Sequence, residues 1–302
     1  MVTIRLAFYL SSGCMGCEMA IVDGLAEVYV ELSQHEIVWS APLFTTSKYS
    51  DLESLPDKYI DVAIVEGGIN SEENERVVRL LRKKSKKIIA LGTCAVHGGI
   101  PSLSSFHSVA EIFDEVYGER HPSRQVVVEG KYSLTLPEIT PQRAVSSAVK
   151  VDHYLPGCPP KVEAIERLIS SLDSLKDEWL ISGDSVCTRC PRSPAREGRG
   201  FRKIESVRRF SGDAVDAEGC FLEHGYLCFG FVTAGDCDAD CPKASVPCRG
   251  CYGPLPNVED VGGKVIDALT PLLNDESTEQ LISEYPELSK LLYLYRPSAL
   301  RE

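Results

Sequence analysis

Residues 3–20, TIRLAFYLSSGCMGCEMA, begin with a short apolar run and continue into a turn of serine, glycine and cysteine. The run Thr3–Leu10 predicts a β-strand, because short runs rich in aliphatic and aromatic residues are typical of strands buried on both faces. A helix is predicted to begin at Glu18, so Cys14 and Cys17 lie where the strand ends and the helix begins. Two cysteines at this spacing indicate a redox dithiol, half of a zinc site, or part of a larger metal cluster.

The same alternation of strand and helix continues as far as residue 180. Further strands are predicted at Glu36–Trp39, Tyr59–Val65, Lys87–Leu91 and Val149–Leu155. Helices are predicted at Glu18–Gln34, Ser71–Lys84, Ser108–Tyr117 and Pro160–Leu172. Strands that alternate with helices indicate a parallel sheet with right-handed crossovers. We therefore predict that residues 1–180 form an α/β domain, a flavodoxin-like doubly wound parallel sheet.

The composition changes after this domain. Residues 181–254 are rich in glycine and contain eight of the twelve cysteines, which predicts a small, irregular second domain. This segment has too few aliphatic residues for a core of its own, so we expect it to need a metal staple. Residues 255–302 are predicted to be a C-terminal helical extension, with helices at Val258–Leu273 and Thr278–Leu292 and a break at Pro286.

Charge and hydropathy exclude several classes of function. The 302 residues carry a formal charge of −12, which argues against a nucleic-acid partner, because phosphate binding needs a basic face. No apolar stretch approaches the roughly 20 residues of a membrane span, and the N-terminus offers no signal peptide. We therefore expect a cytoplasmic protein. Disulfides are rare in that compartment, so metal ligation best explains twelve cysteines.

Four cysteines belong to the first domain. Cys94 and Cys158, like Cys14 and Cys17, follow predicted strands, so all four lie at the carboxyl edge of the sheet, where open α/β sheets bind their ligands. Two lone cysteines on this edge argue against a simple dithiol. A four-thiolate zinc site stays open, although structural zinc usually closes a local pair of short spacings. Cysteines from separate strand ends suit a cuboidal iron–sulfur cluster better.

The other eight cysteines divide into two groups of four. The first group is Cys187, Cys190, Cys220 and Cys228, and the second is Cys237, Cys241, Cys248 and Cys251. Two zinc ribbons are the alternative to two clusters, but the 29 residues between Cys190 and Cys220 fit a ribbon poorly. The spacing also allows Cys228 and Cys237 to exchange groups.

Six ordered motifs within residues 1–254 carry a family resemblance. They are CMGCE, GTCAVHGGIPS, LPGCPP, CTRCPR, GCFLEHGYLCFG and CPKASVPCRGCYGP. With these motifs the chain resembles the electron-transferring small subunit of [NiFe] hydrogenases. It is most similar to the cytoplasmic methyl-viologen-reducing, or F420-non-reducing, type, which is linked to heterodisulfide reductase in methanogens and related archaea. The last 50 residues or so carry no motif of this family.

The resemblance implies three [4Fe–4S] clusters. The proximal cluster would be held by Cys14, Cys17, Cys94 and Cys158, the distal cluster by Cys187, Cys190, Cys220 and Cys228, and the medial cluster by Cys237, Cys241, Cys248 and Cys251. In periplasmic uptake enzymes a histidine stands where Cys187 is, and a proline replaces a medial cysteine, so that the medial cluster has three irons. The chain described here offers twelve thiolates and no twin-arginine signal.

The implied function is electron conduction by an oxidoreductase subunit with no catalytic residue of its own. Hydrogen would be split on a nickel–iron large subunit, and electrons would pass to a downstream iron–sulfur subunit and a heterodisulfide reductase complex. Two alternatives stay open. One is the iron–sulfur subunit of a complex-I-like quinone reductase, which shares only the first domain. The other is a structural subunit stapled by zinc.

Three further features have a plain and a functional interpretation. Glu18 is either a helix N-terminal carboxylate favoured by the helix dipole or a proton relay between subunits. The glycine pair in EGGIN, residues 66–70, is too weak a motif to predict a dinucleotide site. A basic run, Arg189, Arg192, Arg196, Arg199, Arg202, Arg208 and Arg209, is either a solvated loop or a docking face for an acidic redox partner.

Overall fold

Five parallel strands form the centre of the first of the two units into which the chain divides. The computed structural model describes residues 3–41, 47–118, 125–128, 132–135 and 137–296. The first unit ends at Leu180 and the second begins at Ile181. The strands of the sheet are β1 (Arg5–Leu10), β2 (Glu36–Ser40), β3 (Ile60–Glu66), β5 (Ser85–Leu91) and β9 (His153–Leu155). Their order is β2-β1-β3-β5-β9, which confirms the predicted flavodoxin-like α/β fold.

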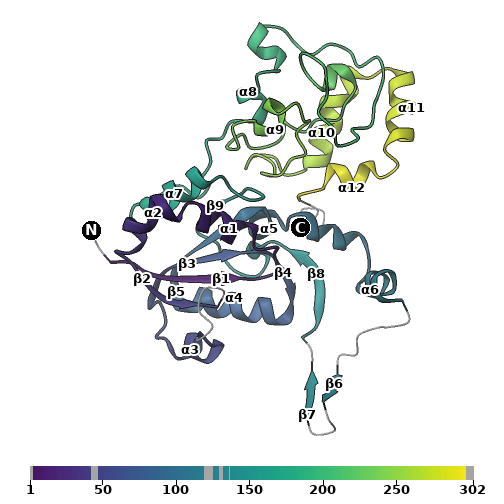
Figure 1. Ribbon diagram of the computed structural model, residues 1–302. Helices are drawn as coiled ribbons and strands as arrows, with labels where there is room; N and C mark the ends of the chain where they lie inside the picture. The colour runs from purple at the N-terminus through teal and green to yellow at the C-terminus, as the bar shows by residue number, and fades with distance from the viewer. Residues whose placement is uncertain (1–2, 42–46, 119–124, 129–131, 136, 297–302) are drawn as a thin grey trace. The chain divides into compact units, whose positions relative to one another are not determined.

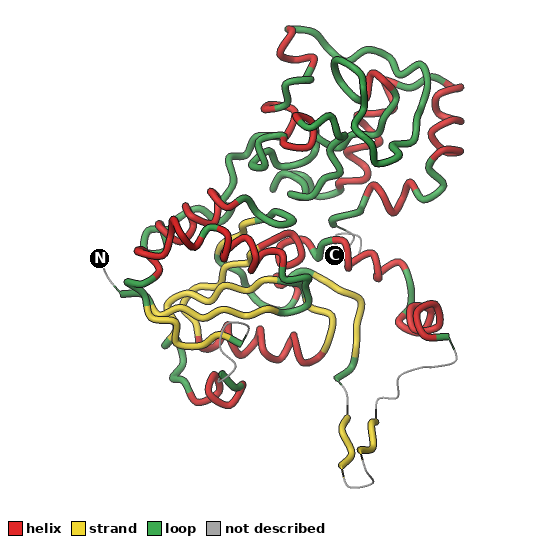
Figure 2. Tube along the Cα trace, viewed as in Figure 1, coloured by secondary structure: helices red, strands yellow, loops and turns green. Residues whose placement is uncertain are grey.

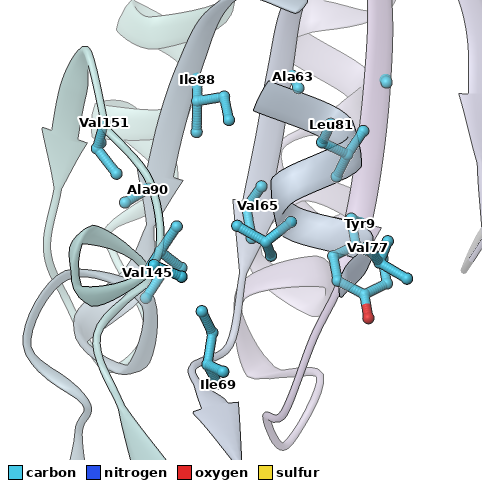
Figure 3. Packing of buried hydrophobic residues seen from close by; sticks show 14 of the residues in the cluster. Tyr9, Ala63, Val65, Ile69, Val77, Leu81, Ile88, Ala90, Val145 and Val151 are labelled. Carbon is cyan, nitrogen blue, oxygen red and sulfur yellow. The ribbon is translucent and has the colours of Figure 1, made fainter. Parts of the chain in front are cut away.

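Helices cover both faces of this sheet (Figure 1). One face packs against α3 (Tyr49–Ser54) and α4 (Glu72–Lys84), and the other against α1 (Gly16–Asp23), α2 (Leu25–Leu32) and α7 (Val162–Ser170). Alternate residues of β1 enter the two cores, as the pleat requires: Ala7 and Tyr9 enter one, and Leu6 and Phe8 the other. Figure 3 shows the first core, where Tyr9, Ala63, Val65, Ile88 and Ala90 of the strands meet Val77 and Leu81 of α4.

Two predicted elements of the first unit differ from the structure. The helix predicted over Glu18–Gln34 is two helices, because α1 ends at Gly24, where a Cβ atom would lie 2.8 Å from Cγ1 of Val162 on α7. The strand predicted over Val149–Leu155 is limited to β9. Residues 149–152 lie outside the strand, and the Asp152 carboxylate accepts a hydrogen bond of 2.8 Å from the Ile88 N–H.

The first unit also contains several short elements, most of which were not predicted. Strand β4 (Ile69–Ser71) pairs antiparallel with β8 (Ile139–Arg143), and β6 (Gln125–Val128) forms a hairpin with β7 (Tyr132–Thr135). The short helix α5 (Gly92–His97) and the 3-10 helix η1 (Ile100–Phe106) follow β5, and α6 (Val109–Tyr117) lies close to its predicted bounds. Helix α5 matters most here, because it carries Cys94.

Loops dominate the second unit, as Figure 2 shows. Its helices are α8 (Val186–Arg189), α9 (Asp240–Lys243), α10 (Val261–Leu269), α11 (Asp275–Glu284) and α12 (Leu288–Leu292), so the last two are separated around Pro286. Apolar residues of the cysteine-rich segment, such as Leu227 and Phe229, pack with Val265 and Leu281 of the C-terminal helices in one core. The cysteine-rich segment therefore uses the C-terminal helices for the aliphatic side chains that it lacks.

No helix among the described residues is long and apolar enough to cross a membrane.

The core of the first unit depends on large side chains of α4 that have no access to solvent. Leu81 is 0% exposed and packs against the sheet (Figure 3). We expect Leu81→Ala to lower the free energy of unfolding by about 2–5 kcal/mol, because it removes buried methyl groups and leaves a cavity. Lys83→Ala, on the exposed side of the same helix, is the control. Anaerobic denaturant unfolding followed by circular dichroism measures both, and equal effects would contradict the assigned packing.

Candidate metal centre

Four cysteines of the first unit line one cavity of about 130 Å³ at the carboxyl edge of the sheet. Cys14 lies in the loop after β1 and Cys17 in the first turn of α1. Cys94 lies in α5, directly after β5, and Cys158 lies in the loop after β9. Three segments that are distant in the sequence thus bring their thiols to one cavity. It lies at the carboxyl edge of the sheet, as the sequence pattern predicted.

Glycines make room for these sulfur atoms. Gly92 has a φ of +85°, and a Cβ atom at this position would lie 2.3 Å from Sγ of Cys17. Gly99 has a φ of +66°, and its Cβ would lie 2.6 Å from Sγ of Cys94. Only glycine adopts such a backbone conformation freely and also leaves this space open. The cavity therefore depends on glycines beside the thiols as much as on the cysteines themselves.

Hydrogen bonds hold two of the cysteine loops together. The Thr93 N–H donates to the Gly157 carbonyl at 2.8 Å, and the Gly157 N–H donates to Oγ1 of Thr93 at 3.0 Å. Because Thr93 precedes Cys94 and Gly157 precedes Cys158, this reciprocal pair fixes the spacing of the two loops.

The surroundings of these thiols oppose a free thiolate. Burial raises the pKa of Cys17, and the carboxyl of Glu66 and the neighbouring thiols raise it further. Burial and the thiols of Cys158 and Cys14 raise the pKa of Cys94 to about 12. Thiolates at such a site require a compensating positive charge, which a metal group provides on binding.

The donor set fits an iron–sulfur group. Thiolate sulfur is a soft ligand that selects iron–sulfur clusters, zinc or cuprous copper. In the part of the chain that the structure describes, no three His, Cys, Asp or Glu side chains surround one point as a single metal ion requires. The four cysteines instead line one cavity, and the neighbouring glycines leave space there for their sulfur atoms.

The second unit gathers four further thiols. Burial raises the pKa of Cys187, and the thiols of Cys228, Cys220 and Cys190 raise it further, so these four side chains lie within electrostatic reach of one another. The Cys187 N–H donates to the Gly230 carbonyl at 3.3 Å.

The other cysteines of the second unit lie nearby in two pairs. The thiol of Cys237 raises the pKa of Cys241, after the larger effect of burial. The pKa of Cys248 is raised by the thiols of Cys228 and Cys251, again after burial. The Cys248 N–H donates to Sγ of Cys228 at 3.3 Å. Cys228 therefore lies beside thiols of both predicted groups. Cys228 is also one of the two cysteines whose group the sequence spacing left open.

Glu66 is a residue of this site that the sequence pattern did not predict. This residue ends β3, is 5% exposed, and lines the cysteine cavity. Burial raises its pKa to about 8, and the carboxyl of Glu18 contributes. Among the described residues, neither Oε1 of Glu66 nor either carboxyl oxygen of Glu18 has a hydrogen-bond partner. The available signal was an acidic residue at the end of a buried strand, directly before the glycine pair of EGGIN.

Comparison with known proteins places these sites in a family context. Residues 14–172 match the family model described as NADH ubiquinone oxidoreductase, 20 Kd subunit. The iron–sulfur subunit of the F420-non-reducing hydrogenase of Archaeoglobus profundus is 40% identical over 308 residues, which cover 97% of this chain and 95% of that protein. A subunit of the F420-non-reducing hydrogenase of Methanothermobacter marburgensis is 32% identical over 88% of this chain and 83% of its own length.

A solved structure shares the fold. The chain aligns with the structure of recombinant [NiFeSe] hydrogenase from Desulfovibrio vulgaris Hildenborough with a TM-score of 0.54 and 18% identity. The alignment covers 85% of this chain and 96% of the other.

Gly92 offers a direct test of the cavity. We expect Gly92→Ala to lower the metal content of the first unit, because the added methyl group and the left-handed backbone displace Sγ of Cys17. Gly118→Ala is the control: Gly118 also has a positive φ, +54°, but its Cβ would meet no atom within 4 Å. Metal analysis after anaerobic purification measures both variants. A Gly92→Ala protein with the metal content of the wild type would show that this cavity does not hold the metal.

Proposed function

The chain belongs to the family of [NiFe] hydrogenase small subunits, among those of the F420-non-reducing type, and we propose that it carries electrons through three [4Fe–4S] clusters. In hydrogenases of this kind the catalytic site lies on the large subunit. The chain is therefore an oxidoreductase subunit that serves electron transfer and contributes no residue to the splitting of hydrogen.

The cluster ligands are the twelve cysteines, in three groups of four. We assign Cys14, Cys17, Cys94 and Cys158 to the proximal cluster, Cys187, Cys190, Cys220 and Cys228 to the distal cluster, and Cys237, Cys241, Cys248 and Cys251 to the medial cluster. The observation that carries the proposal is the shared cavity of the first four cysteines, which the segments after β1, β5 and β9 build at the sheet edge. A structural zinc site draws its ligands from short local spacings instead.

The chain's own residues hold and shield these groups. An iron–sulfur cluster, when bound, supplies one-electron transfer at a potential set by its hydrogen bonds, net charge and exposure to solvent. Cys190, Cys220 and Cys248 are buried, so solvent has little access to those ligands. Backbone N–H groups of Arg192 and Cys248 already donate to Sγ of Cys190 and Cys228, at 3.4 and 3.3 Å. Hydrogen bonds of this kind favour the anionic form of sulfur.

The surface beside the first cavity suits a large partner subunit. Met15 and Met19 are 51% and 64% exposed, and Val22 is also exposed, so α1 and the residue before it present apolar side chains to solvent. Exposed apolar patches of this kind mark protein interfaces. We propose that the nickel–iron large subunit docks here, over Cys14, Gly16, Glu18 and Cys94.

Two observations bear on the partner that accepts the electrons: the exposed arginines of the second unit and the type of the related hydrogenases. Arg196, Arg202, Arg208 and Arg209 are exposed in the basic run of the second unit, which supports docking of an acidic redox partner. By similarity to the F420-non-reducing relatives, we propose a cytoplasmic complex in which a further iron–sulfur subunit passes the electrons to a heterodisulfide reductase complex.

One alternative has an observation in its favour. The family model that matches residues 14–172 bears the name of a subunit of NADH:ubiquinone oxidoreductase, so an iron–sulfur subunit of a complex-I-like quinone reductase accounts for the first unit. It leaves the eight cysteines of the second unit without a role.

Metal analysis separates cluster binding from zinc binding. If three cubanes are present, anaerobically purified protein contains about twelve irons and about twelve sulfides per chain, and dithionite bleaches its brown colour. Two or more equivalents of zinc, or about four irons, would refute the three-cluster assignment.

The order of the clusters can be tested in the intact complex. We expect Cys187→Ser to leave hydrogen–deuterium exchange largely unchanged, because exchange needs only the nickel centre of the partner. The same substitution should slow the reduction of the physiological acceptor or of a bulky dye. Thr188→Ala, an exposed change in the same helix, is the control. Equal loss of exchange and of acceptor reduction would show that the assigned order is wrong.

A further inference from the structure

Arg192 connects three of the cysteine-bearing segments of the second unit. It lies two residues after Cys190, and it is half-buried, unlike the exposed arginines of the basic run. Nη1 donates to the Gly219 carbonyl at 3.3 Å, and also to the Ala217 carbonyl. Gly219 directly precedes Cys220, so this contact ties the Cys190 loop to the Cys220 loop.

The same guanidinium also reaches the segment after Cys241. Nε donates to the Pro242 carbonyl at 3.1 Å, and Nη2 donates to Oγ of Ser245 at 2.7 Å. Four acceptors from two loops thus surround one planar group. Arginine provides the several fixed donor directions that this arrangement needs, and the single ammonium of lysine does not.

An aromatic ring supports the guanidinium from one side. The guanidinium carbon of Arg192 lies 4.6 Å from the centroid of the Phe221 ring, and Phe221 is 2% exposed. Cation–π contact of this kind holds a positive charge beside a buried ring. The charge of Arg192 therefore has a fixed position, against the residue that follows Cys220 in the sequence.

The guanidinium has no carboxylate partner. Arg199 pairs with Glu223, and Arg209 pairs with Glu287, but among the residues that the structure describes no carboxylate lies within ion-pair distance of Arg192. All of its acceptors are neutral. A partly buried charge without a counter-ion is costly, so the site lacks one negative partner.

The sulfur of Cys190 is in position to supply that negative charge. The Arg192 backbone N–H donates to Sγ of Cys190 at 3.4 Å. Cys190 is itself buried, so little solvent screens its sulfur from a charge that is held two residues away.

We propose that Arg192 is a positioning residue that serves as the fixed counter-charge of the iron–sulfur group bound through Cys190, while it holds the Cys190, Cys220 and Cys241 segments together. This inference rests on the proposed function. One-electron reduction adds one negative charge to that group, with the electron drawn from hydrogen oxidation on the partner subunit. A nearby positive charge stabilises the reduced form more than the oxidised form, so Arg192 raises the reduction potential.

The test is the midpoint potential of each cluster in the intact complex, followed by electron paramagnetic resonance. We expect Arg192→Gln to make reduction of one cluster about tenfold less favourable, which is about 59 mV for a one-electron couple. The affected signal should be the one that Cys187→Ser also alters. Arg192→Lys keeps the charge and should stay closer to the wild-type potential. Lys264→Gln removes an exposed charge of the second unit outside the basic run and should shift no cluster.

A second variant tests the charge without removing Arg192. Ser245→Asp places a carboxylate beside Nη2 and should shift the same signal in the same direction, because it neutralises the guanidinium. Ser245 has a positive φ, +62°, which aspartate and asparagine tolerate, so Ser245→Asn is the matched neutral control. If the Arg192→Gln complex fails to assemble, the comparison of Ser245→Asp with Ser245→Asn still tests the effect of the charge.

The outcomes separate this inference from the proposed function. If wild-type protein shows no iron–sulfur signal, the proposed function fails. If the signals are present but neither Arg192→Gln nor Ser245→Asp shifts a potential, or if Arg192→Lys shifts it as much as Arg192→Gln, the counter-charge role is refuted.

Discussion

The parallel alignment of five strands is the constraint on which the first site depends. In a parallel sheet every strand ends at the same edge, so residues that follow β1, β5 and β9 meet there although long segments separate them in the sequence. The glycines beside Cys17 and Cys94 then leave space for sulfur where a Cβ atom would collide with it. The fold therefore forms the site directly, because the segments that follow the strands are also the segments that line the cavity.

The second unit is held together in a different way. Its cysteine-rich segment forms few regular elements, and many apolar residues from its loops reach a core by packing against α10, α11 and α12. Buried thiols and a half-buried guanidinium belong to the same unit. Its polar interior is therefore held partly by the C-terminal helices and partly by hydrogen bonds such as those of Arg192, and a bound metal group would add covalent links between the same loops.

Unpartnered charge distinguishes the two sites. In the first unit, two carboxyl groups, Glu18 and Glu66, lie buried near the thiols, and burial makes their ionised form unfavourable. In the second unit, the backbone N–H of Arg192 donates to Sγ of Cys190, and the guanidinium of the same residue pairs with no carboxylate among the described residues. The first site is therefore lined by carboxyl groups that burial keeps from ionising, whereas the second has a fixed positive charge two residues from a cysteine. Such differences are a physical means by which one chain can set chemically similar clusters at different potentials.

The sequence by itself determined the fold class, the position of most strands and helices, and the edge on which the first four cysteines lie. These features follow from periodicity and from the rule that parallel strands end together. Even the second-unit cysteines were recognisable by count and spacing. The resemblance of six motifs also identified the family, which the relatives confirm.

The tertiary structure decided what periodicity does not encode. Helix α1 gives way to α2 at Gly24, where Val162 approaches too closely for a Cβ atom. The last strand begins only after Asp152, whose carboxylate binds the backbone N–H of Ile88. Glu66 and Arg192 were visible in the sequence only as part of a weak glycine motif and a basic run. Their roles depend on which groups surround them in space, and burial and hydrogen bonding across distant loops are properties of the folded chain alone.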